Sequence, residues 1–274
     1  MATIDYAVNY PGVVDEVLKY SSKSEGVINK NFDFIGAKSV KVYDISVAPL
    51  NDYKRTGSNR YGTPAELDAT AQEMIMSQDK SFTFVIDKMD EDETKGALNA
   101  GQALERQLSQ VVVPMVDKYR FTKLSAGAGT KAEAKALTSA NIFAAITDAT
   151  EVLDNAEVPE TGRQIIVSSA TYKAMKLSKD IVMETEIGQD MRARGVVALI
   201  DGMEVIKVPA SRLPENFGFL VTHPMAAPSP VKLAEYKVND NAPGYSGSLV
   251  EGRIVFDCFI LDNKKSCIYY HAIA

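Results

Sequence analysis

The sequence predicts an α+β fold, and three observations lead to this prediction. Residues 92–125 carry apolar side chains at steps of three and four, which places them on one face of a long helix. Before this segment, residues 38–50, 69–77 and 81–87 are rich in alternating or β-branched side chains, as is typical of strands. After it, helical and strand-like segments alternate as in an α/β unit, and the chain from residue 231 onward has mostly strand character.

The composition is that of a soluble globular protein and argues against several function classes. The 274 residues, 46% apolar and 24% charged, suffice for one large domain or two of ordinary size. A net charge of −6 argues against a protein that binds DNA through a wide basic surface. No apolar run approaches the ~18 to 20 residues of a membrane span, and we expect neither membrane contact nor a secretion signal. Two cysteines suggest a reducing compartment, and two histidines leave little material for metal or acid–base sites.

Residues 1–35 have the character of an arm rather than a domain. They contain one short amphipathic piece, residues 13–20, followed by the polar run SSKSEG. This is too little apolar surface to build a core. Two interpretations stay open, a partly ordered tail and an arm that docks on a neighbouring subunit.

The strands at residues 38–50 and 69–77 predict a long hairpin. Its tip, residues 51–63, is rich in turn-forming residues and carries Lys54, Arg55 and Arg60. An isolated two-stranded hairpin is marginally stable in water. We therefore expect it to lie either on its own domain or on another copy of the chain.

We expect the helix predicted for residues 92–125 to have a structural role, because it carries no catalytic group. Acidic residues at 90–93 and basic residues near its end complement the helix dipole. Two dozen residues give a rod of roughly 35 Å. Pro114 removes one hydrogen bond and should kink the helix rather than end it. The predicted structural spine consists of Leu104, Leu108, Val111, Pro114 and Met115.

The middle of the chain predicts an α/β unit of ordinary domain size. A small-residue loop at 125–134 leads into a helix, and a charged loop at 187–195 carries Arg192 and Arg194. The predicted helices are residues 132–156 and 170–177, and the predicted strands are residues 163–169, 201–209 and 217–223.

The last part of the chain predicts a β-hairpin that turns at Asp262 and Asn263, a pair suited to positive φ. A two-residue loop would place Cys258 opposite Cys267, where side chains approach closely. A cross-strand disulfide and two buried thiols are both possible, and the reducing context favours the thiols.

Five segments in this order resemble the major capsid protein of tailed phages, which has the Hong Kong 97 fold. The resemblance covers nearly the whole chain and rests on order and pattern. The segments are FDFIGAKSVKVYDIS, YKRTGSNRYGT, SFTFVIDKMDEDET, IDGMEVIKVPASRLP and GSLVEGRIVFDCFILDNKKSCIYY.

The resemblance implies a division of the chain into the parts of that fold. Residues 1–35 correspond to the N-terminal arm, and residues 36–88 to the hairpin called the E-loop. Residues 89–125 correspond to the spine helix and peripheral domain, and residues 126–241 to the axial domain. Residues 242–274 correspond to a C-terminal β-hairpin that returns to the peripheral domain.

The resemblance also implies a function. The chain would be a major capsid protein of a tailed phage or prophage, without enzymatic activity or cofactor. It would assemble as hexamers and pentamers into an icosahedral shell around double-stranded DNA, which it would hold without sequence specificity. Its partners would include a portal, a maturation protease and a separate scaffolding protein. Assembly would take place in the host bacterial cytoplasm, and the final location would be the virion.

The resemblance also suggests that several basic residues contact neighbouring subunits. Lys54, Arg55 and Arg60 would meet acidic surface on a neighbour, while Arg192 and Arg194 would form salt bridges around the capsomer axis. Some members of the family join an E-loop lysine covalently to a neighbour's asparagine. Lys54 lies in the right region, but no asparagine of this sequence matches that partner, and we do not expect a crosslink.

Two alternative functions remain. One is the shell of an encapsulin-type compartment, which shares the fold but encloses a cargo enzyme. The other is a metal-dependent α/β enzyme that uses the acidic residues between 87 and 93, whose carboxylates suit a hard cation but also suit a helix start. The sequence contains no phosphate-binding glycine loop, nucleophile elbow or zinc-protease motif.

Overall fold

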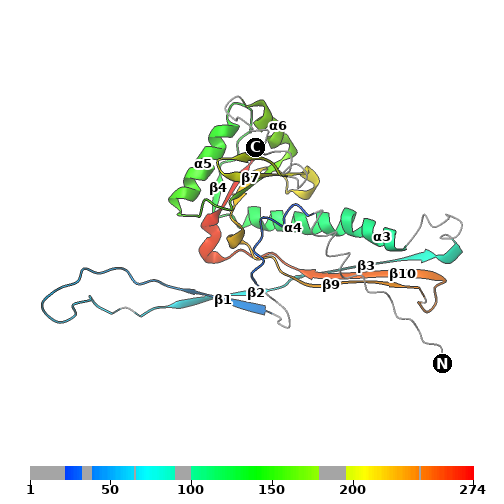
Figure 1. Cartoon of the computed structure of the whole chain (residues 1–274), viewed down its shortest axis with the longest axis horizontal. Coiled ribbons are helices and arrows are strands. Elements are labelled where there is room, and N and C mark those ends of the chain that lie inside the picture. The colour runs from blue at the N-terminus through cyan, green and yellow to red at the C-terminus, as the bar shows by residue number, and fades with distance from the viewer. Residues whose placement is uncertain (1–21, 33–38, 65, 90–99, 179–195, 241) are drawn as a thin grey trace. The chain divides into compact units, whose positions relative to one another are not determined.

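The computed structural model describes residues 22–32, 39–64, 66–89, 100–178, 196–240 and 242–274 (Figure 1). The chain divides into two compact units. The smaller unit contains the described residues from 39 to 76, and the larger unit contains the described residues on either side of it.

The smaller unit is the predicted hairpin. Strand β1 (Ser39–Ile45) pairs antiparallel with β2 (Ala69–Ile75), from Ser39 opposite Ile75 to Ile45 opposite Ala69. The two predicted strands are confirmed, although β1 ends five residues before the predicted end. The chain leaves the ladder there because the residues that follow form the loop of the tip.

The larger unit contains a three-stranded antiparallel sheet covered by a long helix. The strands are β3 (Gln78–Asp87), β9 (Val231–Asn239) and β10 (Gly247–Phe256), in the order β3-β10-β9. Along β10 side chains alternate between the helix face and the open face, as a strand requires. Apolar residues of the sheet and the helix form one core, consisting of Ile86, Ala100, Leu104, Leu108, Val112, Val116, Tyr236, Val250, Ile254 and Phe256.

The helix has three parts, α3 (Ala100–Gln107), a π-helical turn η1 (Leu108–Val112) and α4 (Val113–Ala126). It runs along the three-stranded sheet (Figure 1). The predicted helix is confirmed from residue 100 onward, whereas residues 90–99 lie outside the described part of the chain.

One predicted spine residue is wrongly placed. Leu104 and Leu108 are buried and Pro114 and Met115 are half-buried, but Val111 is 49% exposed. The cause is the π-turn, in which the N–H of Val113 donates to the carbonyl of Leu108 instead of the residue four back. The extra residue rotates the following side chains around the axis, so that Val112 and Val116 face the core. The kink at Pro114 stays a prediction.

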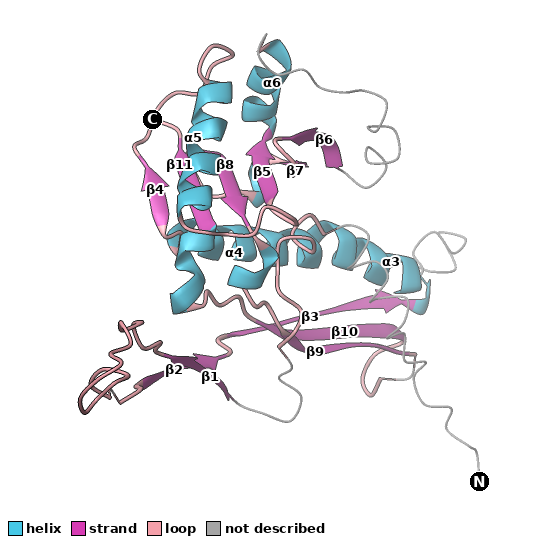
Figure 2. Cartoon of the chain, turned by 60° about the vertical axis from the view of Figure 1, so that its left-hand side comes forward, coloured by secondary structure: helices cyan, strands magenta, loops and turns pink. Residues whose placement is uncertain are grey.

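A second, six-stranded mixed sheet lies in the same unit (Figure 2). Its order is β4-β11-β8-β5-β7-β6, with β5 parallel to β7 and β4 parallel to β11. The strands are β4 (Thr130–Ala132), β5 (Gln164–Ser168), β6 (Val196–Ile200), β7 (Met203–Val208), β8 (Phe217–Thr222) and β11 (Ile268–Ala272).

Two helices, α5 (Ile142–Asn155) and α6 (Ser169–Leu177), contribute to the core of this sheet. The end of α4 adds Phe121 and Leu124 to the same core, so α4 joins the two cores of the unit. The predicted segments that correspond to β5, α6, β7 and β8 are confirmed.

The start of the predicted axial region, residues 126–142, differs from the prediction. Residues 130–132, predicted as loop, form β4 and pair with β11. The helix predicted from residue 132 begins only at Ile142, because the chain leaves β4 at Ala132 and first forms a loop. The side chain of Asn141 stabilises the turn before the helix by accepting a hydrogen bond from the N–H of Thr138. Strand β6 was not predicted.

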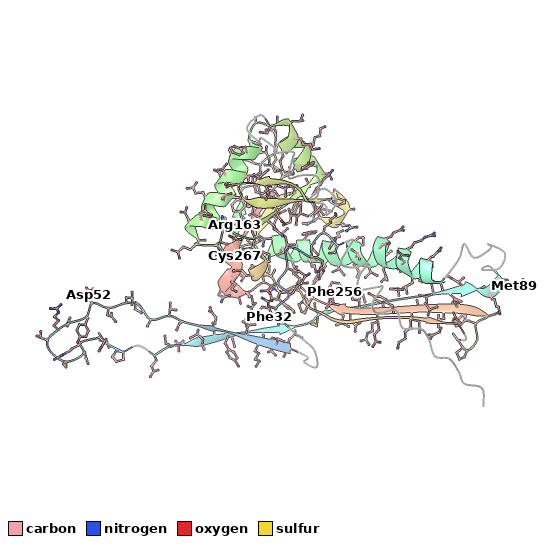
Figure 3. The ribbon with its side chains drawn as sticks, viewed as in Figure 1. Phe32, Asp52, Met89, Arg163, Phe256 and Cys267 are labelled. Atoms are coloured by element: carbon pink, nitrogen blue, oxygen red, sulfur yellow. The ribbon has the colours of Figure 1, made fainter. Side chains whose placement is uncertain are left out.

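The predicted C-terminal hairpin is wrong. Strands β10 and β11 lie in different sheets, and residues 262–267 form a 3₁₀ helix, η4 (Asp262–Cys267), instead of a two-residue turn. The chain leaves β10 at Asp257, whose own carboxylate accepts the N–H of Cys258, and β11 pairs with β8. Figure 3 labels Phe256 and Cys267 at the two ends of this connection. Cys258 and Cys267 are buried free thiols, so the disulfide interpretation is wrong.

Candidate assembly surfaces

The hairpin unit exposes an unusual amount of apolar surface. Among the described residues of this unit, the large apolar side chains that are more than half exposed are Tyr43, Ile45, Val47, Leu50, Tyr53, Tyr61, Leu67 and Ile75. Two strands cannot bury both of their faces against each other. Exposed apolar side chains gain free energy when a partner covers them.

The tip of the hairpin is held by hydrogen bonds and a ring contact among its own residues. The N–H of Lys54 donates to the carbonyl of Arg60 over 3.0 Å, and Nε of Arg60 donates to the carbonyl of Gly57 over 3.2 Å. The rings of Tyr53 and Tyr61 pack edge to face with their centroids 5.1 Å apart. Gly57 takes φ = 91°, which an L side chain rarely adopts.

These contacts bring the three predicted basic residues of the tip together. Lys54, Arg55 and Arg60 are exposed on one short loop, where the main chains of Lys54 and Arg60 are hydrogen-bonded. Arg192 and Arg194, the other predicted contacts, lie outside the described residues.

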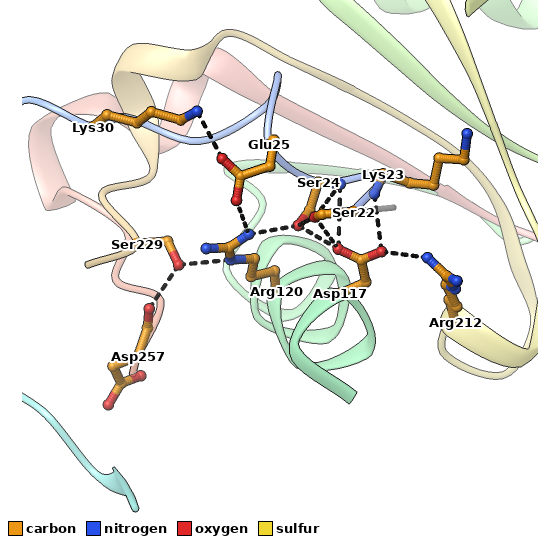
Figure 4. Close-up of polar contacts among 10 residues, drawn as sticks. All are labelled: Ser22, Lys23, Ser24, Glu25, Lys30, Asp117, Arg120, Arg212, Ser229 and Asp257. Carbon is orange, nitrogen blue, oxygen red and sulfur yellow. Dashed lines mark hydrogen bonds and ion pairs between the residues drawn. The ribbon is translucent and has the colours of Figure 1, made fainter. Parts of the chain in front are cut away.

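A second candidate region is a buried polar network on α4 (Figure 4). Asp117 is fully buried, and its carboxylate accepts hydrogen bonds from the hydroxyls of Ser22 (2.6 Å) and Ser24 (2.7 Å). It also accepts the N–H of Lys23 over 3.0 Å and Nη1 of Arg212 over 2.9 Å. One carboxylate thus ties the segment 22–24 to the helix.

Arg120, one turn further along α4, is 2% exposed and holds the same segment. Its Nη1 donates to Ser24 Oγ (2.9 Å) and Glu25 Oε1 (3.0 Å), and its Nε donates to Ser229 Oγ (2.9 Å). Lys30 adds a salt bridge to Glu25. Burial alone would raise the pKa of Glu25, but the charges of Arg120 and Lys30 outweigh it and hold that pKa below its usual range.

Asp257 extends the network to the beginning of β3. Its Oδ2 accepts the N–H (2.7 Å) and the hydroxyl (2.9 Å) of Ser77, and its Oδ1 accepts the hydroxyl of Tyr119 over 2.8 Å. Its main-chain carbonyl accepts Ser229 Oγ over 2.7 Å. Ser77 directly follows the hairpin unit in the sequence.

Comparison with known proteins shows which solved structures share this architecture. No family model matches the sequence, and no curated protein matches it. Among solved structures, the capsid of the cyanophage P-SCSP1u matches with a TM-score of 0.66 at 13% identity, covering 100% of this chain and 90% of that one. The mature capsid of bacteriophage PhiM1 matches with a TM-score of 0.65 at 10% identity, again over 100% and 90%. A virus-like particle from Pyrococcus furiosus gives 0.58 at 11% identity, over 94% and 95%.

The chain shares the fold of these capsid structures. The mixed helix and sheet architecture expected from the resemblance is confirmed. The division into N-terminal arm, E-loop, peripheral domain and axial domain stays a prediction, except that the C-terminal hairpin is replaced by the connection described above.

The described residues contain neither a metal-binding cluster nor a membrane-spanning helix. In the described ranges, no group of three or more His, Cys, Asp and Glu side chains lies close enough together to hold a metal ion. Part of the acidic run, residues 90–93, lies outside those ranges. No helix among the described residues is long and apolar enough to cross a membrane.

Sequence reasoning missed the network around Asp117 and Arg120. The run SSKSEG has the polar character of an arm without core contacts, yet residues 22–25 bind α4 and Val27 is fully buried. A signal was present, because Asp117 and Arg120 interrupt an apolar helix that continues with Phe121 and Leu124. Charges on a helix buried on two sides require partners, and here the segment 22–25 supplies them.

Proposed function

We propose that the protein is a capsid shell subunit, the major capsid protein of a tailed phage or prophage. Copies would assemble as hexamers and pentamers into an icosahedral shell around double-stranded DNA. The observation that carries the proposal is the likeness to phage capsids over the full length of the chain. Function does not follow from fold alone, and the hairpin provides the second argument.

The hairpin has the properties of an element that binds another subunit. Two strands without a core of their own are marginal in water, and eight exposed apolar side chains gain by being covered. A neighbouring copy is the natural partner, because each subunit of a closed shell then both gives and receives a hairpin. Many such contacts add up, since the effective concentration within an assembly is high.

The basic tip would give this contact its orientation. Lys54, Arg55 and Arg60 would meet acidic surface on the neighbour, and complementary charge contributes more to specificity and association rate than to affinity. Arg192 and Arg194 would form salt bridges around the capsomer axis.

The net charge fits a container for DNA. A subunit with a net charge of −6 does not attract duplex DNA strongly, so a packaged genome would stay mobile inside the shell. The proposed partners are a portal, a maturation protease and a scaffolding protein. The subunit would assemble in the host bacterial cytoplasm and become part of the virion.

A second candidate function is the shell of a protein compartment that encloses cargo protein. The likeness to the Pyrococcus furiosus virus-like particle favours it as the alternative. Nuclease treatment of particles purified from a native source separates the two. Protected double-stranded DNA supports the capsid, whereas a co-purifying enzyme without protected DNA supports the compartment.

The tip can be tested by charge reversal. The double variant Lys54→Glu with Arg55→Glu should give a folded subunit with unchanged circular dichroism that forms few shells, measured by sedimentation and electron microscopy. The matched control, Lys54→Arg with Arg55→Lys, keeps both charges and should assemble normally. Normal shells from the charge-reversed protein would rule out the proposed role of the tip.

A further inference from the structure

We propose that the network around Asp117, Arg120 and Asp257 couples segment 22–30 to Ser77, where the chain leaves the hairpin unit. The two sites are then held together or released together. This inference concerns a single subunit and stands whether or not the protein forms shells.

The contacts form a continuous path between the two sites. From Ser77 the path runs to the carboxylate of Asp257, and the main-chain carbonyl of Asp257 then accepts Ser229 Oγ. Ser229 Oγ in turn accepts Nε of Arg120. Arg120 then reaches Ser24 and Glu25 through Nη1.

The path is shielded from water along most of its length. Arg120, Ser229 and Asp257 are all buried. In such surroundings hydrogen bonds strengthen one another, and a buried polar group that loses its partner is costly. Removing one member therefore weakens its neighbours, which is the physical basis for coupling between the ends.

Segment 22–30 depends on this network for its position. Its buried apolar side chains are Val27 and Ile28, while Ser22, Ser24 and Glu25 bind through polar contacts. A segment with so few apolar contacts opens locally more readily than the sheets beside it. Ser77 likewise depends on Asp257, which binds both its N–H and its hydroxyl.

The coupling has a consequence for the proposed shell subunit. If the hairpin docks on a neighbour, the chain at Ser77 could shift, and the loss of its hydrogen bonds to Asp257 would weaken the contacts that hold segment 22–30.

Hydrogen exchange on the unassembled subunit tests the proposal. Ser229→Ala cuts the middle of the path without touching either end. We expect exchange to accelerate at least threefold both in segment 22–30, where Val27 and Asn29 amides are bonded, and at the Ser77 amide. Acceleration at one end alone, or at neither, would overturn the coupling.

Two further variants sharpen the test. Ser77→Ala removes one hydroxyl at the hairpin end and should accelerate exchange at Val27 and Asn29, which it does not contact. Ser248→Ala is the matched control, because its buried hydroxyl bonds Asp240 outside the network on β10. It should leave both ends unchanged, and an equal effect from Ser248→Ala would contradict a path through Ser229.

Discussion

Replacing Asp117 by asparagine should release segment 22–30 from α4. The side chain is fully buried, and its two oxygens accept hydrogen bonds from Ser22, Lys23, Ser24 and Arg212. Asparagine has the same shape, but one oxygen becomes an NH₂ group that cannot accept hydrogen bonds. Whichever way the amide turns, at least two donors lose their acceptor.

The magnitude follows from the hydrogen bonds that the substitution breaks. Hydrogen bonds to a charged group contribute about 1.5–3 kcal/mol each, and breaking a buried ion pair costs about 3–5 kcal/mol. Arg212 is partly exposed and regains water, so we expect a loss near the lower end, about 3 kcal/mol. At about 1.4 kcal/mol per tenfold change, exchange at the Val27 and Asn29 amides should accelerate roughly a hundredfold.

Amide hydrogen exchange by mass spectrometry is the assay, with urea denaturation to confirm folding. The control is Asp79→Asn, which removes an ion pair to Arg253 whose side chains are both about half exposed. It should leave exchange in segment 22–30 unchanged. If Asp117→Asn left the segment as protected as in the parent protein, the role assigned to this carboxylate would be refuted.

Three further predictions concern other groups of the same unit. Tyr236→Phe should leave stability unchanged or slightly raised in urea denaturation, because its buried hydroxyl has no hydrogen-bond partner among the described residues; a large loss would contradict this. Cys258 and Cys267 should resist iodoacetamide until the protein unfolds, because both are buried and burial raises the pKa of the Cys258 thiol to about 12; rapid alkylation of the native protein would refute it. Arg120 and Lys30 lower the pKa of Glu25, so the ionised Glu25 carboxylate stabilises the folded segment above about pH 4.5, and this contribution is lost as pH falls through the folded-state pKa. Exchange in segment 22–30 should therefore accelerate in acid after correction for the intrinsic rate; an unchanged protection factor would speak against it.

The sequence predicted those elements whose pattern reflects local burial. The stripe around Leu104 and Leu108 and the apolar strand at residues 164–168 follow from periodicity, because each faces a single core or is buried throughout. Val111 was misplaced because periodicity assumes a uniform helix, and one π-turn shifts the phase. No local signal marked that turn other than Pro114 two residues after it.

Long-range pairing was the part that could not be predicted. Asp262 and Asn263 suit a tight turn, but β11 finds a better partner in β8. The network on α4 joins residues 22–25 to residues nearly a hundred positions away, and no pattern within either segment encodes the partner. Asp117 and Arg120 indicated that a partner was needed without indicating which one.

We propose that copies of this chain close into a shell. Electron microscopy of the purified protein, over a range of concentrations and salt, tests it most directly. We expect closed particles of uniform diameter, or rings of five and six subunits. A stable monomer under every condition, confirmed by light scattering, would contradict it.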